Sequence, residues 1–366
     1  MCLCTLHAHT RNFASIYHQP AERMTGLSVT IKQISEISGV SRGTVDRVLN
    51  GRGRVSPEKE LIVRKVAEQL GYRPNLAGKA LAARKKSYTI GVLLTSRGIS
   101  FFDEVIRGVK QSAQELTDYG VNVMIREFKG YDSAVQIREI EALVPHVNVL
   151  ILNPINEPVI AQKINELVDS GVCVITLNTD VENSRRLCHV GSDYIKSGET
   201  VCGIMGLLLH GKGKLGILTG SVKILGHNQR IIGIRNVMRE KYPEIEIVDI
   251  GETNDDDIVG FEASRKMLQN HPEINGLIIV AAGAYGVCRA VLSMEFSPRP
   301  IIVSVDNVPT TEEMIREGII QATVCQQPFQ QGYQAVQQAF QYLISGQKPE
   351  KERFITTNEI KILENL

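Results

Sequence analysis

The sequence predicts two parts: an N-terminal all-α helix-turn-helix headpiece, and an α/β body of two lobes, each built on a doubly wound parallel sheet. Short helical patterns separated by glycines occupy residues 28–74, whereas β-rich runs alternate with helix-length segments from residue 88 onward. The charge is divided in the same way. Residues 28–87 hold 13 Lys and Arg against 5 Asp and Glu, whereas residues 88–366 hold 26 against 34. A basic module joined to an acidic body indicates that the module binds a polyanion.

The bulk composition excludes several classes of protein. With 366 residues, of which 43% are hydrophobic and 22% charged, the chain is long enough for two or three globular domains. No apolar run is long enough to cross a bilayer, so a membrane protein is disfavoured. Seven cysteines without a regular framework fit a reducing compartment, and we expect a cytoplasmic protein. Residues 1–27 lack a helical pattern, a strand pattern and a secretory signal, so we expect a disordered extension there.

Two short helices around a tight turn are predicted between Thr30 and Gly51. Thr30 can cap the first helix, and Gly39 ends it in the usual C-terminal manner. Ser41 can cap the second helix, which ends at Gly51. The apolar positions of the two helices recur at helical spacing, and they are Ile31, Ile34, Ile37, Val45, Val48 and Leu49. A helix, a turn with glycine and a second helix form a helix-turn-helix arrangement.

A third amphipathic helix is predicted to begin at Pro57, after Ser56, and to stop at Gly71. Its apolar positions are Leu61, Val66, Ala67 and Leu70. The three helices also fit an ordinary bundle with a basic outer face, which is the alternative to a DNA-binding module.

The functional interpretation places the second helix in the major groove of DNA. Arg42, Gly43 and Thr44 would then face base edges from its first turn, and Arg47 would reach them one turn later. Arginine suits this role because its guanidinium can bond guanine O6 and N7 together. Hydroxyl and backbone N–H groups at the two helix starts suit phosphates, and these positions are Thr30 and Ser41.

The continuation "LGYRPNLAGKALAARKKS" makes the pattern more specific. Residues 29–87 resemble, without a gap, the lactose-repressor (LacI/GalR) family of bacterial transcription regulators, with "TIKQISEISGVS", "TVDRVLNG", "VSPE" and "LGYRPN" in family order. The resemblance implies that residues 75–87 form a hinge helix and linker that order on operator DNA, with Leu81 wedged between base pairs in the minor groove. Leu81 as mere linker packing is the alternative. The same resemblance adds four DNA-contacting candidates, which are Asn50, Asn75, Gly78 and Lys79.

The headpiece departs from that family at two positions. Asp46 stands where serine is usual, and because a carboxylate repels phosphate, we expect it to pair with Arg42 or Arg47, or to accept a hydrogen bond from a cytosine amine. Gly78 stands where alanine or serine is usual and weakens hinge helicity by roughly 0.5–1 kcal/mol. The hinge is therefore predicted to depend more strongly on DNA for its order.

The body alternates strands with helices, which predicts parallel sheets covered on both faces. Nine β-rich runs exceed a single small sheet, so we expect two lobes: about residues 88–190 with 328–355, and about residues 191–327 with 356–366. The predicted helical segments are 102–116, 133–143, 158–170, 195–210, 228–240, 257–269 and 330–345.

Polar residues follow the predicted strands at the carboxyl ends, where such sheets bind ligands. They are Asn153, Asn178, Thr179, Asp180, Asp193, Thr253, Asn254, Asp255, Asp306 and Asn307. Several are also expected to cap the following helices. Amides, hydroxyls and scattered carboxylates without metal-ligand spacing suit a hydroxylated small molecule.

The body also resembles the rest of the family, whose core is similar to periplasmic sugar-binding proteins of the ribose type. "ISFF" matches a segment that packs aromatic rings on the sugar. Asn178 and Thr179 replace the Asp-Arg of ribose binders, Ala284–Tyr285 replaces a more usual Asn-Asp, and Asn228 replaces an arginine for which Arg230 can compensate. The effector-binding candidates are Phe101, Phe102, Asn153, Asn178, Thr179, Asn228, Arg230, Asn254, Tyr285, Asp306 and Gln326.

The sequence therefore predicts a regulator of the LacI/GalR family, in most cases a repressor, with a periplasmic-binding-protein-like effector domain. We expect operator DNA that is pseudo-palindromic, a sugar or polyol effector, a homodimer, and neither a cofactor nor a metal. His189, His210 and His227 are isolated, and no catalytic motif is evident, so an enzyme is not expected. A solute receptor for transport and a sugar-modifying enzyme on the same fold are the alternatives.

Overall fold

The computed structural model describes residues 29–49, 53, 55–72 and 87–366. The chain divides into two compact units, residues 1–75 and 76–366, and each is described by itself. The predicted extension at residues 1–27, the predicted helix end at Gly51 and most of the predicted hinge lie outside the described residues.

The headpiece contains three helices, α1 (Ile31–Ser38), α2 (Arg42–Leu49) and α3 (Pro57–Gln69). Thr30 caps α1 as predicted: its hydroxyl accepts from the Gln33 backbone N–H at 3.3 Å, and the Gln33 side chain accepts from the Thr30 N–H at 2.8 Å. Gly39 ends α1 with φ at 66°, a left-handed conformation that suits glycine. The predicted helix-turn-helix is thus confirmed.

The core of the headpiece is smaller than the apolar pattern predicts. Its fully buried members are Ile34, Val45 and Val63. Ile37 and Leu61, both predicted on the inner face, are 60% and 71% exposed. The core positions of α3 begin at Val63 instead, and Val40 beyond the turn packs into the same cluster.

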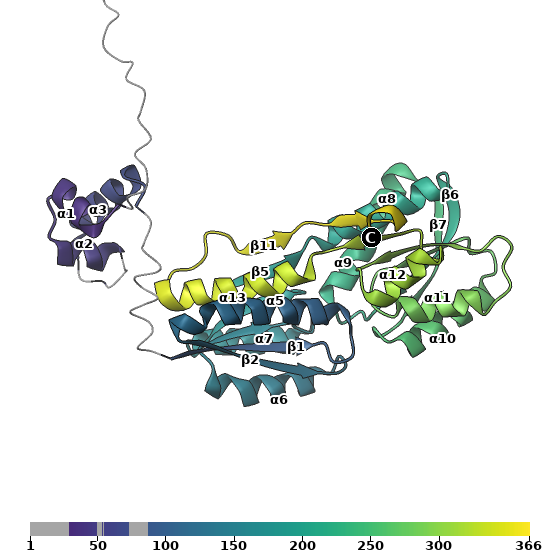
Figure 1. The fold of residues 1–366 in the computed structure, drawn as a ribbon, viewed down its shortest axis with the longest axis horizontal. Helices are drawn as coiled ribbons and strands as arrows, with labels where there is room; N and C mark the ends of the chain where they lie inside the picture. Colours follow the sequence, from purple (N-terminus) through teal and green to yellow (C-terminus); the bar gives the residue numbers. More distant parts are fainter. Residues whose placement is uncertain (1–28, 50–52, 54, 73–86) are drawn as a thin grey trace, which may run out of the picture. The chain divides into compact units, whose positions relative to one another are not determined.

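The first lobe of the body is a sheet of six strands, all parallel, in the order β11-β5-β4-β3-β1-β2. Its strands are β1 (Tyr88–Thr95), β2 (Val121–Phe128), β3 (Val149–Leu152), β4 (Cys173–Asn178), β5 (Cys188–Ser192) and β11 (Arg353–Thr356). Helices α5 (Phe101–Leu116) and α13 (Pro328–Ser345) pack on one face, and α6 (Ser133–Leu143) and α7 (Pro158–Asp169) pack on the other. Figure 1 shows α5 and α13 side by side above the strands and α6 below them.

The second lobe is a sheet in the order β12-β10-β9-β8-β6-β7, in which only the β12–β10 pair is antiparallel among the described strand pairs. Its strands are β6 (Lys212–Thr219), β7 (Glu244–Glu252), β8 (Gly276–Ile279), β9 (Ile301–Val305), β10 (Ala322–Cys325) and β12 (Glu359–Lys361). Helices α8 (Tyr194–Leu208) and α9 (Leu225–Lys241) cover one face. The opposite face is covered by α10 (Asp257–Asn270), α11 (Ala284–Leu292) and α12 (Pro309–Arg316).

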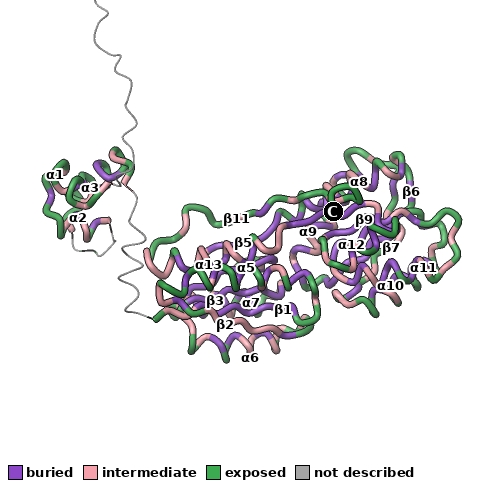
Figure 2. The backbone as a smooth tube through the Cα atoms, in the orientation of Figure 1, coloured by how far each residue is buried: buried purple, intermediate pink, exposed green. Residues whose placement is uncertain are grey.

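Apolar side chains of neighbouring strand positions alternate between the two faces of each sheet. In β1, Val92 joins the cluster under α5 and α13, whereas Leu93 joins the cluster under α6 and α7. Figure 2 shows that the buried positions run along the strands while the outer sides of the helices are exposed. The predicted fold class is confirmed: an N-terminal helix-turn-helix headpiece is followed in the sequence by two doubly wound lobes.

The helix pair on the first lobe is held together through glycines. A Cβ atom on Gly108 would lie 2.0 Å from the Phe329 carbonyl oxygen, and one on Gly332 would lie 2.0 Å from that of Val105. Larger residues at either position would separate α5 from α13. The chain then crosses between the lobes after β5, after β10 and after β11, so the segments at these crossings adjoin both sheets.

Candidate functional site

Helix α2 presents its first turn to solvent. Val45 and Val48 are buried beneath it, while Arg42, Gly43 and Arg47 are exposed on the opposite side. The Ser41 and Thr44 hydroxyl groups lie 3.0 Å apart at the start of this helix, and the Arg47 Nε donates to the Gly43 carbonyl oxygen at 3.2 Å. Of the described DNA-binding candidates, Thr30, Ser41, Arg42, Gly43 and Arg47 are exposed and Thr44 is half-buried. The remaining candidates, Asn50, Asn75, Gly78, Lys79 and Leu81, lie outside the described residues.

The charge of Asp46, on α2, acts on a residue that follows the third helix. Burial and then the Asp46 charge raise the pKa of Tyr72, which follows α3. The predicted pairing of Asp46 with Arg42 or Arg47 stays a prediction.

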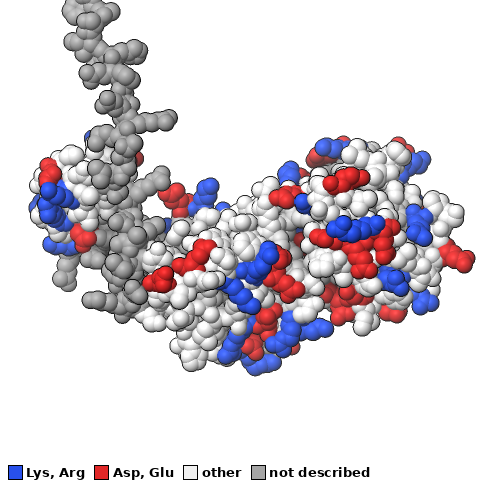
Figure 3. Space-filling model, viewed as in Figure 1, with Lys and Arg blue, Asp and Glu red and all other residues white. Residues whose placement is uncertain are grey.

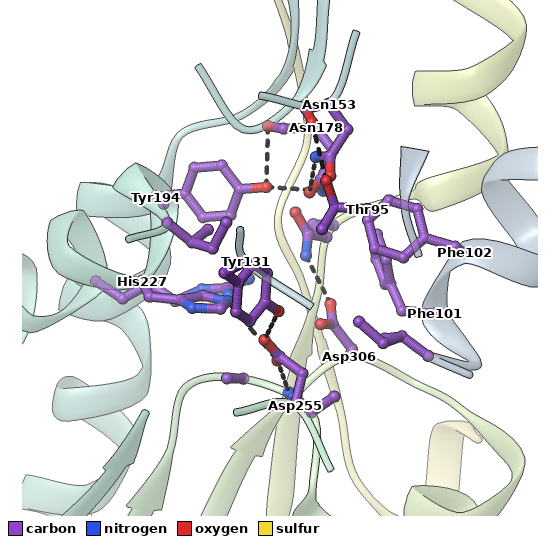
Figure 4. A pocket seen from close by; sticks show the side chains of 17 residues that line it. Thr95, Phe101, Phe102, Tyr131, Asn153, Asn178, Tyr194, His227, Asp255 and Asp306 are labelled. Carbon is purple, nitrogen blue, oxygen red and sulfur yellow. Dashed lines mark hydrogen bonds and ion pairs between the residues drawn. The ribbon is translucent and has the colours of Figure 1, made fainter. Parts of the chain in front are cut away.

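A cavity lies between the two lobes of the body, at the carboxyl ends of their strands, with about 480 Å³ of empty space, part of which is open to solvent. Figure 4 shows its labelled side chains converging from both lobes. Seven sequence-predicted candidates line it: Phe101, Phe102, Asn153, Asn178, Arg230, Asp306 and Gln326. The other lining residues are Thr95, Ile99, Tyr131, Tyr194, Ile224, Gly226, His227, Asp255, Ala281 and Ala282.

The wall from the first lobe combines aromatic rings with amides. Phe101 and Phe102 begin α5, and their rings meet edge to face with centroids 5.2 Å apart. Asn178 ends β4 in a left-handed conformation, with φ at 66°. Its Nδ2 donates to the Tyr194 hydroxyl at 2.9 Å, and that hydroxyl donates to the Asn178 carbonyl oxygen at 3.0 Å. The Asn153 Nδ2 donates to the Leu177 carbonyl oxygen at 3.2 Å, so both amides are held in place.

Arg230 is the most distinctive group in the wall from the second lobe. The side chain belongs to α9 and is only 2% exposed. Its Nη1 donates to the Val280 carbonyl oxygen at 2.9 Å, its Nε donates to the Ser197 hydroxyl at 3.3 Å, and its guanidinium carbon lies 4.7 Å from the Tyr194 ring centroid. Its Nη2 has no hydrogen-bond partner among the described residues. Because a buried charged donor without a partner is costly, this atom indicates a place for a ligand oxygen.

Two carboxylates complete the polar wall. Asp306 follows β9 with φ at 67°, and its Oδ1 accepts from the Gln326 Nε2 at 2.8 Å. Burial raises the pKa of Asp306, although the positive charge of Arg230 opposes that effect. Asp255 accepts from the Ala282 backbone N–H at 2.9 Å and also from the Tyr131 hydroxyl. Two carboxylates against one arginine give the wall no excess of positive charge.

His227 lies beside Asp255 in the cavity wall. Its Nδ1 lies 3.1 Å from the Ser221 backbone nitrogen and 3.3 Å from the Ser221 carbonyl oxygen. Its Nε2 lies 3.9 Å from the Asp255 Oδ1. Burial lowers the pKa of His227, and the nearby carboxylate opposes the shift. A neutral His227 ring can donate or accept one hydrogen bond through its Nε2, according to its tautomer.

Four predicted effector residues do not line the cavity. Thr179 turns away, and its hydroxyl accepts from the Gly226 backbone N–H at 3.2 Å. The Asn228 Nδ2 donates to the Val222 carbonyl oxygen at 2.7 Å on the outer side of α9. Asn254 is exposed in a turn with φ at 49°, and Tyr285 packs against the core of the second lobe. The left-handed backbone conformation of Asn178 explains why Thr179 does not line the cavity, because it redirects the Thr179 side chain.

Several contacts connect the lobes beside the cavity. The Lys223 Nζ lies 2.8 Å from the Glu157 Oε1 and donates to the Tyr131 carbonyl oxygen at 3.1 Å. The Asn156 backbone N–H donates to the Lys223 carbonyl oxygen at 2.8 Å. The Tyr131 hydroxyl bond to Asp255 joins the same set. The structure is therefore closed around the cavity on this side.

The fold and the cavity define a two-lobed small-molecule-binding protein that also carries a helix-turn-helix module. Residues 90–348 match the periplasmic binding protein domain, and residues 30–75 match the bacterial regulatory proteins of the lacI family. The chain therefore belongs to the lacI-type regulatory proteins with a periplasmic-binding-protein domain, which confirms the predicted family. Within the described ranges, every helix is too short or too polar to cross a lipid bilayer.

Known proteins similar to this chain include both transcription regulators and sugar-binding proteins. The probable HTH-type transcriptional repressor ExuR of Bacillus subtilis is 40% identical over 115 residues, covering 30% of this chain and 34% of that protein. Catabolite control protein A of Priestia megaterium is 26% identical over 69% of this chain and 74% of its own. The ribose import binding protein RbsB of Bacillus subtilis is 25% identical over 76% of this chain and 88% of its own. Among solved structures, GanP, a glucose-galactose binding protein from Geobacillus stearothermophilus, has a TM-score of 0.71 and 25% identity, covering 77% of this chain and 99% of that chain.

Proposed function

We propose that this protein is a sequence-specific DNA-binding transcriptional regulator, acting as a repressor, whose operator affinity is controlled by a small uncharged sugar or polyol. One observation carries the proposal: a single chain holds both an exposed arginine face on a helix-turn-helix and a polar cavity between two lobes. The relatives support it, because they include a transcriptional repressor as well as ribose and glucose-galactose binding proteins.

The chemistry of the cavity supports an uncharged, hydroxylated ligand. Phe101 and Phe102 offer apolar ring surfaces, while the Asn153 and Asn178 amides offer both donors and acceptors. Arg230 stands beside two carboxyl groups, so the wall offers no cluster of positive charge of the kind that binds a phosphate or a sugar acid. Hydroxyl groups can donate to the carboxylates and accept from the arginine, and so they match both kinds of group.

The proposed mechanism couples closure of the lobes to DNA binding. We infer a homodimer that presents two α2 helices to a pseudo-palindromic operator in the cytoplasm, where the chromosome lies. The effector changes the relative position of the lobes, and through the hinge it changes the affinity for the operator. Coupling of this kind is reciprocal, so operator DNA must change the effector affinity by the same factor.

Two alternatives make different predictions. A solute receptor for transport would need no exposed arginine helix, yet α2 presents Arg42 and Arg47 outward. A sugar-modifying enzyme would need an activated nucleophile or base. The Thr95 hydroxyl already donates to the Asn153 carbonyl oxygen at 3.3 Å, and the His227 Nδ1 already lies within hydrogen-bond distance of the Ser221 backbone. These groups are arranged to hold a ligand in place.

The experiment measures binding of the full chain to fragments of its own upstream region and to random duplexes, with and without a panel of sugars. We expect at least one upstream fragment to bind about 1,000-fold more tightly than random DNA at moderate salt, with an affinity that one sugar changes. Residues 88–366 alone should bind sugar and lose the preference for that fragment. Equal affinity for all duplexes, together with no response to any sugar, would refute the proposal.

A further inference from the structure

A buried network of hydrogen bonds surrounds the Asn178 side chain in the cavity wall. Both signs of charge are mixed over the visible face of the body (Figure 3), whereas the members of this network are uncharged and buried: Asn153, Asn178, Tyr194, Gln326 and Gln331. Figure 4 shows Asn153, Asn178 and Tyr194 close together in the wall. An asparagine amide can both donate and accept hydrogen bonds. The network determines which of the two the Asn178 amide offers to a ligand.

The Tyr194 hydroxyl takes up one of the two Asn178 amide protons. This hydroxyl has a single proton, which it donates to the Asn178 backbone carbonyl oxygen at 3.0 Å. It can therefore only accept from the Asn178 side chain, and the Asn178 Nδ2 donates to it at 2.9 Å. The ring is held in place, because a Cβ atom on Gly226 would lie 3.0 Å from two of its carbon atoms and the Arg230 guanidinium carbon lies 4.7 Å from its centroid.

The Gln331 side chain takes up the second proton. Its Nε2 donates to the Gln326 carbonyl oxygen at 2.8 Å, which fixes the orientation of the Gln331 amide because a backbone carbonyl can only accept. The Gln331 Oε1 therefore faces Asn178 and accepts from its Nδ2 at 3.2 Å. Both protons of the Asn178 amide are thus donated to protein groups.

The Asn178 Oδ1 is the atom of this amide that remains for a ligand. The Asn153 Nδ2 lies 3.4 Å from it and also donates to the Leu177 carbonyl oxygen at 3.2 Å, so the atom of Asn153 that faces Asn178 is the nitrogen. One long contact leaves the Asn178 oxygen a lone pair for a further donor. Asn178 lines the cavity and is only 8% exposed, and a buried acceptor is costly to leave unpaired.

We propose that Tyr194 and Gln331 are positioning residues: they hold the Asn178 amide so that its oxygen accepts a hydrogen bond from one hydroxyl group of the effector. The effector must therefore donate at this position, and a ligand that carries only an acceptor there is rejected. This inference rests on the proposed function, and it adds a requirement for one hydroxyl group to the uncharged, hydroxylated ligand.

The test measures, by calorimetry on the full chain, how strongly each hydroxyl group of a bound sugar is required. D-glucose, D-galactose, D-xylose and L-arabinose are tested first, and the sugar that binds is compared with its monodeoxyfluoro analogues. Fluorine is similar in size to a hydroxyl group but cannot donate. The ratio of the analogue Kd to the sugar Kd is therefore the fluorine penalty at each position. Where a hydroxyl group donates to a buried acceptor, we expect a penalty of about tenfold or more.

The variant Asn178→Asp identifies the hydroxyl group that contacts residue 178. Aspartate tolerates the left-handed backbone at this position, where φ is 66°. It keeps the acceptor and adds negative charge, so the fluorine penalty should rise at the contacted position alone. In the wild type that same position should already show a penalty of about tenfold. A wild type that tolerates fluorine there would show that the amide nitrogen faces the ligand, and the inference would be overturned.

The variant Tyr194→Phe tests the positioning role, because it keeps the ring beside Arg230 and removes only the hydroxyl. One amide proton is then released, and the penalty at the contacted position should fall by about threefold or more, with the other penalties unchanged. Tyr194→Phe combined with Gln331→Met releases both protons and should lower that penalty further. Tyr333→Phe is the matched control: it removes an exposed hydroxyl that donates to the Glu115 Oε2 at 2.6 Å, and it should keep every penalty. Circular dichroism confirms that each variant is folded.

The outcomes separate this inference from the proposed function. If a sugar binds but the penalty at the contacted position is the same in the wild type and in both Tyr194 variants, the inference is overturned while the sugar-responsive regulator stands. Equal changes at every position would also overturn it, because they show a general loss of structure in the cavity. If no sugar binds, the proposed effector class is refuted, and the inference is refuted with it.

Discussion

The buried histidine of the first lobe gives the body a calculable dependence of stability on pH. His189 lies in β5 and is 1% exposed. The Thr176 hydroxyl donates to the Asp180 Oδ1 at 2.8 Å and lies 3.0 Å from the His189 Nδ1. Because that hydroxyl already donates its proton, it accepts one from Nδ1–H, which sets the neutral tautomer. The Arg186 guanidinium also binds Asp180, with Nη2 and Oδ2 2.6 Å apart, and neutralises its charge.

Burial is the main cause of a lowered pKa for His189, to about 4, although Asp180 opposes it. The unfolded chain takes up this proton near pH 6.5, whereas the folded chain stays neutral down to about pH 4. The contribution to stability is therefore complete above pH 6.5 and is lost as the pH falls toward 4. A gap of about 2.5 pH units at 1.36 kcal/mol per unit corresponds to about 3 kcal/mol. His227, whose pKa is also lowered by burial, adds to the loss in the same direction.

The variant His189→Asn removes the titration and keeps an N–H donor where Nδ1 stands. Urea unfolding of the full chain, followed by circular dichroism between pH 4.5 and 8, measures the free energy of unfolding of the body. We expect the wild type to lose roughly 2–3 kcal/mol more than the variant between pH 7 and 4.5, with parallel curves above pH 7. An equal loss in both proteins would refute the argument. A histidine proton resonance that titrates near pH 6.5 and disappears in the variant would refute it as well.

Three further predictions concern the binding surfaces. Arg230→Met should weaken binding of the responsive sugar by about 10- to 150-fold in calorimetry, since it removes charged hydrogen bonds, and Asn228→Ala, which lies off the cavity, should stay within about twofold. Arg47→Ala should weaken binding to the operator by about 10-fold or more and leave random DNA less affected in fluorescence anisotropy at fixed salt. Tyr131→Phe removes the hydroxyl bond to Asp255 between the lobes. Small-angle scattering of the sugar-free protein should then show a more open body, and an unchanged profile would contradict this.

The strands β1–β9 could be predicted from the sequence, whereas β10, β11, β12, α11 and α12 could not. All nine predicted β-rich runs correspond to β1–β9. Most are buried apolar runs, as parallel strands usually are, whereas β2 and β7 at the sheet edges mix apolar with exposed polar residues. The strands β10, β11 and β12 are only three or four residues long, and Ile355 and Ile360 at the sheet edges are exposed. Helices α11 and α12 are nine and eight residues long. β3, β8, α1 and α2 are equally short and were predicted, so length alone does not explain the missed elements, whose structure comes from tertiary packing.

The candidate site was predictable where a residue directly follows a strand, and less so elsewhere. Asn153, Asn178 and Asp306 lie in the cavity for this reason. Asp255, which also lines the cavity, was among the polar residues predicted to follow strands. Tyr131 lies in a loop and reaches across from the other lobe, so no local signal could place it.

The cavity is connected to the segments where the chain crosses between lobes, and this supplies a physical path for the effector response. Gln326, in the crossing after β10, donates to Asp306 in the cavity wall, while its carbonyl oxygen accepts at 2.8 Å from Thr356, the last residue of β11 before the chain crosses. Gln331 donates to the same carbonyl at 2.8 Å and accepts from the Asn178 amide at 3.2 Å. A ligand that reorients Asn178 or Asp306 therefore changes hydrogen bonds at two crossings. Because a ligand shifts an equilibrium only by its differential affinity for the two states, a sugar that contacts one lobe alone should bind without changing the operator affinity.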